Sequence, residues 1–323
     1  MAVYTEIDDD ELSTFIARYG LGRVLACKGI AEGVENTNYM VDTDKGRFFL
    51  TLYEKRVDPK DLPFFLGLMD HLAARGISCP LPVRDQTGAM LGTLAARPAA
   101  VITFLDGLSP RHPKAHHCHE VGRALATLHA AGAGFPLQRK NALGVPGWRP
   151  LFEKFRTDAN SITPGLAEDI AAELATLEQN WPNNLPSGII HADLFDDNVF
   201  FLGDRLSGII DFYFACNDAF AYDVAICLNA WCFDNHHRFD REKGHALLSG
   251  YQEVRQLTEA ERNQLPILAR GSALRFLLTR AYDWINTPKG ALVARKDPGE
   301  YLAKLRFHRT VTTASMYGLE ARS

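Results

Sequence analysis

The chain has 323 residues, of which 46% are hydrophobic and 23% are charged, close to the averages of soluble globular proteins. This length favours more than one domain and is long enough for a core that needs no disulfide or metal to fold. A formal net charge of −4 argues against a general nucleic-acid coat protein, which would be strongly basic.

The sequence contains no obvious membrane or export segment. Residues 224–233 form its most apolar stretch, which is shorter than the roughly 18 residues of a membrane helix and includes Asn229. The acidic N-terminus lacks the basic and apolar regions of a secretory signal, and the six cysteines form no CxxC pair. We therefore expect a cytoplasmic protein with no membrane or nucleic-acid partner.

The first third of the sequence predicts mainly β-structure. Acidic residues followed by apolar residues at helical spacing predict a helix at residues 8–19. Two β-rich runs joined by a short Gly-containing turn predict a hairpin of residues 38–43 and 47–53. The remaining predicted elements of this part are a helix at residues 62–75 and strands at residues 81–83 and 99–105.

Helical patterns dominate after residue 106. They predict helices at residues 116–131, 165–179, 221–232, 241–254, 258–286 and 298–317. Strand signals are confined to residues 188–190, 198–202 and 206–210, and the Gly- and Pro-rich residues 132–150 predict a loop. The sequence thus predicts an α+β protein with a β-rich lobe (residues 1–105), a hinge near residues 103–107 and a larger helical lobe (residues 106–323).

One pattern carries most of the chemical information. His191, Asp193 and Asn198 form an HxDxxxxN string, and Asp211 follows a strand-like Gly-Ile-Ile run. By itself the string is equally typical of a surface loop with Asp and Asn turns. Together with Asp211 it fits phosphoryl transfer, in which one carboxylate orients and deprotonates a hydroxyl while an amide and a second carboxylate hold Mg²⁺.

These motifs resemble the aminoglycoside-phosphotransferase-like kinases, which are relatives of the protein kinases. Their catalytic loop reads HGDLxxxN and their metal aspartate lies in IDF or IDW; here the phrases are HADLFDDN and IDF. The LATLH phrase at residues 125–129 and the segment at residues 218–225 are also similar. The resemblance implies a two-lobed kinase-like fold with a small antiparallel N-lobe and ATP and Mg²⁺ as cofactors. It also implies that Asp193 is the base, that Asn198 and Asp211 hold the metal, and that His191 braces the loop.

A finer resemblance is to the homoserine kinases of threonine biosynthesis. It lies in residues 33–39, 49–54 and 274–283. It implies phosphorylation of L-homoserine to O-phospho-L-homoserine, and arginines in the C-terminal half favour an acceptor with an anionic group. The alternatives are kinases for aminoglycosides, choline or methylthioribose, and a catalytically dead nucleotide-sensing module.

The resemblance also assigns contacts to ATP and to the acceptor. Thr51 and Phe65 occupy the places where related kinases have a lysine and its glutamate partner, so the usual ion-paired clamp on the ATP phosphates is missing. For the acceptor, Asp234 is the candidate for the ammonium group, and Arg275 or Arg280 for the carboxylate. The nucleotide candidates are Gly33, Asn36, Thr37, Asn38, Thr51, Thr103, Phe104 and Leu105.

Overall fold

The computed structural model describes residues 5–30, 36–54, 58–287 and 295–319. The chain divides into two compact units. Unit 1 comprises the described residues up to Asp106 together with Gly208–Ile210, and unit 2 contains the other described residues. In the described part of the chain, none of the helices combines the length and apolar character needed to cross a membrane.

Unit 1 is built on a five-stranded antiparallel sheet in the order β1-β2-β3-β5-β4. Its strands are β1 (Val24–Ile30), β2 (Thr37–Thr43), β3 (Gly46–Leu52), β4 (Gly92–Leu94) and β5 (Arg97–Thr103). Buried and half-buried residues alternate strictly along β2, as expected for a strand with one face on a core.

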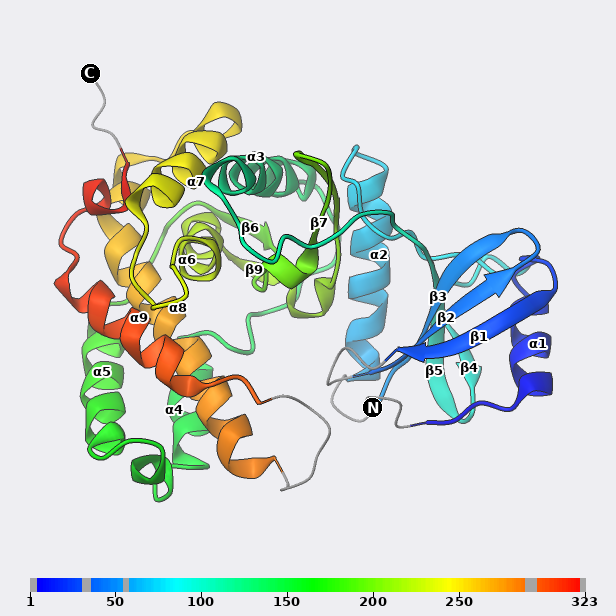
Figure 1. Cartoon of the computed structure of the whole chain (residues 1–323), viewed down its shortest axis with the longest axis horizontal. Coiled ribbons are helices and arrows are strands. Elements are labelled where there is room, and N and C mark those ends of the chain that lie inside the picture. Colours follow the sequence, from blue (N-terminus) through cyan, green and yellow to red (C-terminus); the bar gives the residue numbers. More distant parts are fainter. Residues whose placement is uncertain (1–4, 31–35, 55–57, 288–294, 320–323) are drawn as a thin grey trace. The chain divides into compact units, whose positions relative to one another are not determined.

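Two helices accompany this sheet and lie on opposite sides of it (Figure 1). Helix α1 (Asp9–Ala17) begins after Asp8, whose carboxylate accepts hydrogen bonds from the first-turn amides of Asp10 and Glu11. Its apolar stripe joins the sheet in one cluster of buried residues. Helix α2 (Leu62–Ala73) follows a short 3₁₀ turn, η1 (Pro59–Asp61), and buries seven of its twelve residues.

Unit 2 is mainly helical. Its helices are α3 (Ala115–Ala131), α4 (Val145–Glu153), α5 (Leu166–Asn180), α6 (Phe220–Trp231), α7 (Arg241–Val254), α8 (Glu259–Asn286) and α9 (Pro298–Thr310). Its two small ladders pair β6 (Ser187–Ile190) with β9 (Cys216–Ala219) and β7 (Val199–Leu202) with β8 (Arg205–Ile209). Its 3₁₀ turns are η2 (Ala159–Ser161), η3 (Asp196–Asn198), η4 (Phe212–Phe214) and η5 (Ala314–Tyr317).

Helix α6 is the centre of unit 2. Ten of its twelve residues are buried, so it is surrounded on all sides by protein. Figure 1 shows it nearly end-on, with α3, α7, α8 and α9 around it. Because α6 follows directly on β9, which pairs with β6, the position of its first turn is fixed relative to β6.

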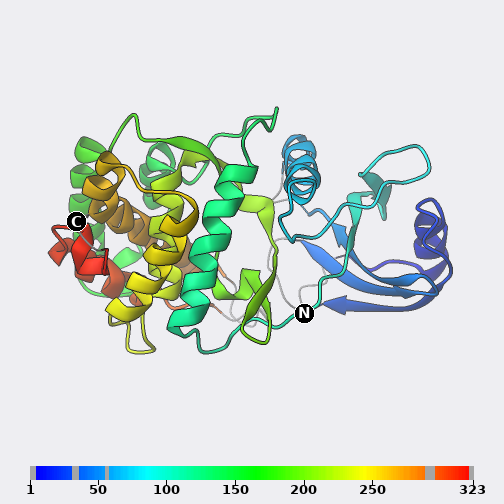
Figure 2. The same ribbon diagram turned by 90° about the horizontal axis from the view of Figure 1, so that it is seen from above.

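Helices α3 and α7 run side by side at very short range (Figure 2). A Cβ atom on Gly122 would lie 2.1 Å from the carbonyl oxygen of Leu247, and one on Gly250 would lie 2.1 Å from that of His119. The two glycines therefore allow a contact between the helices that no other residue would permit.

The α+β class, with an antiparallel sheet and a larger helical part, is confirmed. Three local predictions are wrong. Residues 81–83 form a single β-bridge to β5, between Pro82 and Ile102, which is flanked by hydrogen bonds from the Val83 amide to Val101 and from the Thr103 amide to Leu81. The predicted loop at residues 132–150 contains the start of α4. The predicted helix at residues 298–317 ends at Thr310, where Val311 turns extended.

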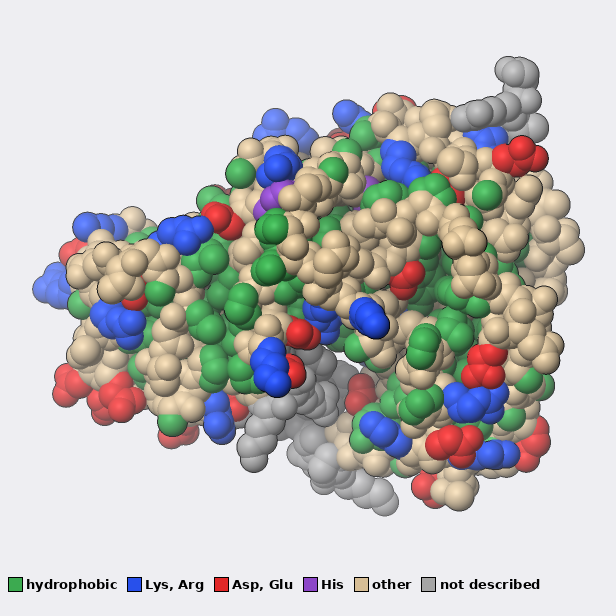
Figure 3. Space-filling view, turned by 180° about the vertical axis from the view of Figure 1, so that it is seen from behind, with side chains coloured by type: hydrophobic (Ala, Val, Ile, Leu, Met, Phe, Trp, Pro, Cys, Tyr) green, Lys and Arg blue, Asp and Glu red, His purple; other side chains and the backbone are tan. Residues whose placement is uncertain are grey.

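The surface shows no dominant charge on the face drawn in Figure 3. There, Lys and Arg side chains are interspersed with Asp and Glu side chains and with apolar ones. Such a face lacks the continuous basic stripe that binds nucleic acid.

Candidate active site

The loop between β6 and β7 carries the HxDxxxxN residues and is closed by hydrogen bonds between its own side chains and backbone. Buried His191 accepts a hydrogen bond at Nδ1 from the Asp193 amide (3.3 Å). The Asn198 side chain donates through Nδ2 to the Asp193 carbonyl oxygen (2.8 Å). Both ends of the loop therefore hold the backbone of Asp193.

A buried carboxylate from α6 anchors the start of this loop. Asp223 accepts hydrogen bonds from the amides of His191 (2.7 Å) and Ala192 (2.9 Å), and its Oδ2 also lies 3.0 Å from Nε2 of His129 on α3. Burial opposes its ionisation, but the contact with His129 and the backbone amides hold the pKa of Asp223 below its usual value. Asp223 is therefore a fixed negative charge beneath the loop.

The environment of Asp193 combines burial with charges of both signs. Burial raises the pKa of its carboxyl to about 7; the Asp211 and Asp197 carboxylates add to the rise, and Arg275 opposes it. Its side chain is still 18% exposed. An accessible carboxylate whose pKa lies near neutrality is suited to accept a proton.

Arg275 on α8 lies against the same loop. Its Nη1 donates to the carbonyl oxygen of Ala192, and its Nη2 lies 3.8 Å from Oδ1 of Asp193. Its guanidinium also covers the ring of Phe276, with 4.3 Å between the guanidinium carbon and the ring centre. The structure thus places Arg275, a candidate for the acceptor's carboxylate, behind the catalytic loop.

The residues expected to hold Mg²⁺ offer oxygen donors of the right kind. The Asn198 amide nitrogen is used inside the loop, which fixes the direction of its amide oxygen. Asp211 follows β8 by two residues and has a left-handed backbone conformation (φ 63°, ψ 69°). Its negative charge contributes to the raised pKa of Asp193. A hard divalent cation prefers such carboxylate and amide oxygens, and it would relieve the repulsion between the two carboxylates.

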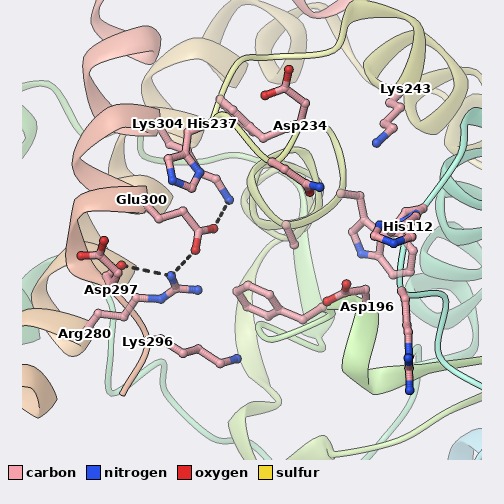
Figure 4. A pocket seen from close by; sticks show the side chains of 17 residues that line it. His112, Asp196, Asp234, His237, Lys243, Arg280, Lys296, Asp297, Glu300 and Lys304 are labelled. Carbon is pink, nitrogen blue, oxygen red and sulfur yellow. Dashed lines mark hydrogen bonds and ion pairs between the residues drawn. The ribbon is translucent and has the colours of Figure 1, made fainter. Parts of the chain in front are cut away.

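A cavity of about 660 Å³ lies in unit 2 beside the catalytic loop (Figure 4). Phe195 and Asp196 of the loop contribute to its wall, and Arg280, Glu300 and Lys304 lie together at another part of it. The other lining residues are Arg111, His112, Pro113, Ala230, Trp231, Phe233, Asp234, Asn235, His237, Lys243, Lys296 and Asp297.

The two remaining acceptor candidates, Asp234 and Arg280, both line this cavity. The carboxylate of Asp234 closes its own loop: it accepts hydrogen bonds from the amides of His236 and Arg238 (2.9 Å each) and from Nε of Arg238 (2.9 Å). The bond from the Arg238 amide is the main cause that lowers the pKa of Asp234, to about 2.

The nucleotide candidates lie in unit 1, apart from Gly33, which lies outside the described residues. Thr37 donates to Glu54 (2.8 Å), the Asn36 side chain accepts from the Glu54 amide (3.4 Å), and Thr51 donates to Asn38 (2.9 Å).

The hinge candidates lie at the end of β5. Thr103 exchanges hydrogen bonds with Leu81 (2.9 Å each), and Phe104 stacks on Phe49 with 5.5 Å between ring centres. A Cβ atom on Gly208 would lie 2.8 Å from a methyl carbon of Leu105, so Leu105 packs closely on that backbone.

Sequence reasoning gave no role to His129, Asp223, Glu300 or Lys304. His129 and Asp223 lie in the two segments, residues 125–129 and 218–225, that resemble the kinase family. Each is a polar residue among the apolar residues of a helix, and this is the sequence feature that could have identified them. Glu300 and Lys304 are spaced i, i+4 on α9, a common pattern on exposed helices that does not single out a site.

The chain was compared with known proteins. The model of the phosphotransferase enzyme family matches residues 26–257. A protein of Sinorhizobium fredii named homoserine kinase is 64% identical over 319 residues, which cover 99% of this chain and 98% of the relative. Homoserine kinases of Rhizobium meliloti and Parvibaculum lavamentivorans are each 62% identical, covering 99% of this chain and 98% and 100% of the relatives.

Solved structures share the fold at low identity. An amicoumacin kinase in complex with AMP-PNP, Ca²⁺ and Ami matches with a TM-score of 0.69 and 15% identity, covering 96% of this chain and 94% of that one. A spectinomycin phosphotransferase in complex with ADP and spectinomycin matches with a TM-score of 0.68 and 13% identity, covering 97% and 98%. The expected kinase-like fold is thereby confirmed, and the chain belongs to the phosphotransferase enzyme family.

Proposed function

We propose that the protein transfers the terminal phosphoryl group of ATP to the hydroxyl of L-homoserine, giving O-phospho-L-homoserine for threonine biosynthesis. The observation that carries the reaction type is the Asp193 carboxylate, held on a closed loop beside Asn198 and under the charge of Asp211. The identity of the acceptor is supported by the full-length similarity to proteins named homoserine kinase.

In this proposal Asp193 orients the acceptor hydroxyl and takes its proton as the oxygen attacks phosphorus. The loop contacts of His191 and Asn198 keep its backbone in place, and Asp223 fixes the two residues before it. Asn198 and Asp211 would hold Mg²⁺, which neutralises charge on the phosphates when bound.

We assign the nucleotide to the lobe of residues 1–105 and the catalytic loop and acceptor to the lobe of residues 106–323. Asn36, Thr37, Asn38 and Thr51 are the proposed neighbours of the phosphates, and residues 103–105 those of the adenine. With Thr51 in the place of a lysine, the phosphate charge is balanced by Mg²⁺, by backbone amides or by another basic side chain.

A nucleotide-sensing module without activity is the alternative from another class. The absence of a lysine at residue 51 favours it. The closed loop argues against it, because a binding module needs no accessible carboxylate with a pKa raised towards neutrality.

The test is ³¹P NMR of the protein incubated with ATP, Mg²⁺ and L-homoserine, in the parent and in the Asp193→Asn variant. We expect a phosphomonoester product in the parent and a rate lower by roughly two to four orders of magnitude in Asp193→Asn, which cannot accept the proton. Asp204→Asn, at an exposed turn residue, is the matched control and should keep the parental rate. Comparable rates in Asp193→Asn and the control would refute the proposed base.

A further inference from the structure

One wall of the cavity in unit 2 is a cationic cluster of Arg280, Glu300 and Lys304 (Figure 4). Glu300 bridges the two cations: its Oε2 lies 2.5 Å from Nη1 of Arg280 and its Oε1 lies 2.6 Å from Nζ of Lys304. Lys304 also donates to the carbonyl oxygen of Asn229 (2.8 Å). Two cations share one carboxylate, so the cluster has an excess positive charge.

These side chains are held away from bulk water. The side chain of Arg280 is 11% exposed and that of Lys304 is 5% exposed. The ring of Tyr301 packs on both: its centre lies 4.4 Å from the guanidinium carbon of Arg280 and 4.5 Å from Nζ of Lys304. An excess charge of this kind, shielded from solvent, attracts an anion more strongly than an exposed arginine does.

The polar contacts of Arg280 with described residues use one of its three guanidinium nitrogens, Nη1. Within the described ranges, its hydrogen bonds, to Glu300 and to the Asp297 carbonyl oxygen (3.4 Å), both use Nη1. A guanidinium has five N–H donors in a fixed fork, so the edge formed by Nε and Nη2 can bind both oxygens of a carboxylate.

Arg280 of the cluster lies on the same helix, α8, as Arg275, which contacts the proposed base. Arg275 reaches Asp193 from α8, and Arg280 follows five residues later, about 7.5 Å further along the helix axis. The hydroxyl oxygen and the carboxyl carbon of homoserine are separated by four bonds, or about 5 Å when extended. Phe195, two residues after Asp193, lines the cavity and packs on Phe276 of α8 (4.9 Å between ring centres).

We propose that Arg280 binds the α-carboxylate of the acceptor through its Nε/Nη2 edge and that Glu300 positions Arg280 for this contact. The inference rests on the proposed function and deepens it: it makes Arg280 the residue that selects an amino-acid acceptor over an amino alcohol. Arg275, behind the loop, then contributes to the placement of Asp193.

The test compares two acceptors that differ only in the carboxylate, L-homoserine and 3-aminopropan-1-ol. We expect Arg280→Met to lower kcat/KM for L-homoserine by roughly a hundredfold, mainly through KM, and to leave the value for 3-aminopropan-1-ol nearly unchanged. Turnover of 3-aminopropan-1-ol also shows that the variant is folded. Glu300→Gln should raise KM for L-homoserine alone, and Arg156→Gln, at an exposed arginine of the same unit, should affect neither acceptor.

The outcomes separate this inference from the proposed function. Equal losses on both acceptors in Arg280→Met, with an active parent, would overturn the carboxylate contact and leave the reaction standing. Equal losses on both in Glu300→Gln would overturn its positioning role. A parent that phosphorylates 3-aminopropan-1-ol at least as well as L-homoserine would overturn the proposed acceptor and the carboxylate site together.

Discussion

Ala192, between the histidine and aspartate of the catalytic loop, has a left-handed backbone with φ of 63°. Its amide donates to Asp223 and its carbonyl oxygen accepts from Arg275, so both sides of the residue are fixed. A non-glycine residue in this region costs of order 1 kcal/mol or more. The HGDL motif that this loop resembles has glycine at this position, where glycine would adopt the same φ without the strain that alanine carries.

We therefore predict that Ala192→Gly is tolerated. Relief of strain offsets the larger entropy of the unfolded chain, so the free energy of unfolding should change by less than about 1 kcal/mol, with activity retained. Ala192→Val, in contrast, should destabilise by about 2 kcal/mol or more, because a β-branched residue disfavours positive φ. Urea unfolding of both variants measures this, and a stable, active valine variant would contradict it.

Thr51 provides a second test at this scale. Its hydroxyl donates to the Asn38 side chain (2.9 Å) and it is 3% exposed. Removing it in Thr51→Ala should cost about 1 kcal/mol of stability and lower kcat/KM for ATP by less than about tenfold. Thr51→Lys should not improve ATP use, because an ammonium group at this buried position without a carboxylate partner has a desolvation cost. A thousandfold loss in Thr51→Ala would make Thr51 a principal catalytic group.

The sequence was informative on the residues of the loop and less so on residues distant from it. Asp193, Asn198 and His191 lie within eight positions, so their spacing alone predicts that they meet. Arg275 was recognised as unusual on an apolar helix, but its contact with Ala192 spans 83 positions. No local pattern encodes which way such a side chain points.

At the scale of elements, the contact of α3 with α7 depends on two glycines. We predict that Gly122→Ala lowers the free energy of unfolding by about 2 kcal/mol or more. The new Cβ would collide with a backbone carbonyl, and this exceeds the roughly 1 kcal/mol that alanine gains in helix propensity. Ala130→Ser, at an exposed position of the same helix, is the control and should stay within about 0.5 kcal/mol. Equal thermal stability of the two variants would contradict the close contact.

Long elements with a clear period were predicted well, and short ones were not. Helix α7 has the predicted bounds, because Asp240 caps its start and its apolar residues repeat at helical spacing. Helix α4 was missed because glycine and two prolines suggested a loop. Yet Pro146 occupies the first turn, where no amide bond is lost, and Trp148 and Phe152 are buried. Strand β9 contains Asn217 and Asp218, which have low strand propensity, and it forms through tertiary pairing with β6 and with Lys140.

At the scale of the whole molecule, buried His308 links α9 to α6 and to η5. Its Nε2 donates to the Asn229 side chain (3.0 Å), and its Nδ1 accepts from the Tyr317 hydroxyl (2.7 Å). Burial, aided by the charge of Lys304, lowers its pKa to about 3. In the unfolded chain a histidine binds its proton near pH 6.5, so acidification below that value favours unfolding.

We predict that His308→Gln removes this dependence. The stability difference between parent and variant should shrink as the pH falls from 6.5 towards 4.5, by up to about 1.4 kcal/mol per pH unit. Using the difference cancels other titrating groups, among them Asp193, whose raised pKa acts with the opposite sign. Chemical denaturation across this range is the measurement, and a difference independent of pH would mean that His308 is protonated in the folded protein.

The central claim concerns the whole molecule. We propose that this kinase-like protein phosphorylates the hydroxyl of an amino acid and that Asp193 on the loop between β6 and β7 accepts the proton. The most direct measurement is the specificity constant of the parent protein for L-homoserine, choline and kanamycin with ATP and Mg²⁺. We predict a value for L-homoserine well above the other two, because we propose that Arg280 in the cavity binds the acceptor's carboxylate and that Asp193 on the adjoining loop accepts its hydroxyl proton. A higher value for choline or kanamycin would contradict the acceptor, and no turnover with any of the three would contradict catalysis by the loop.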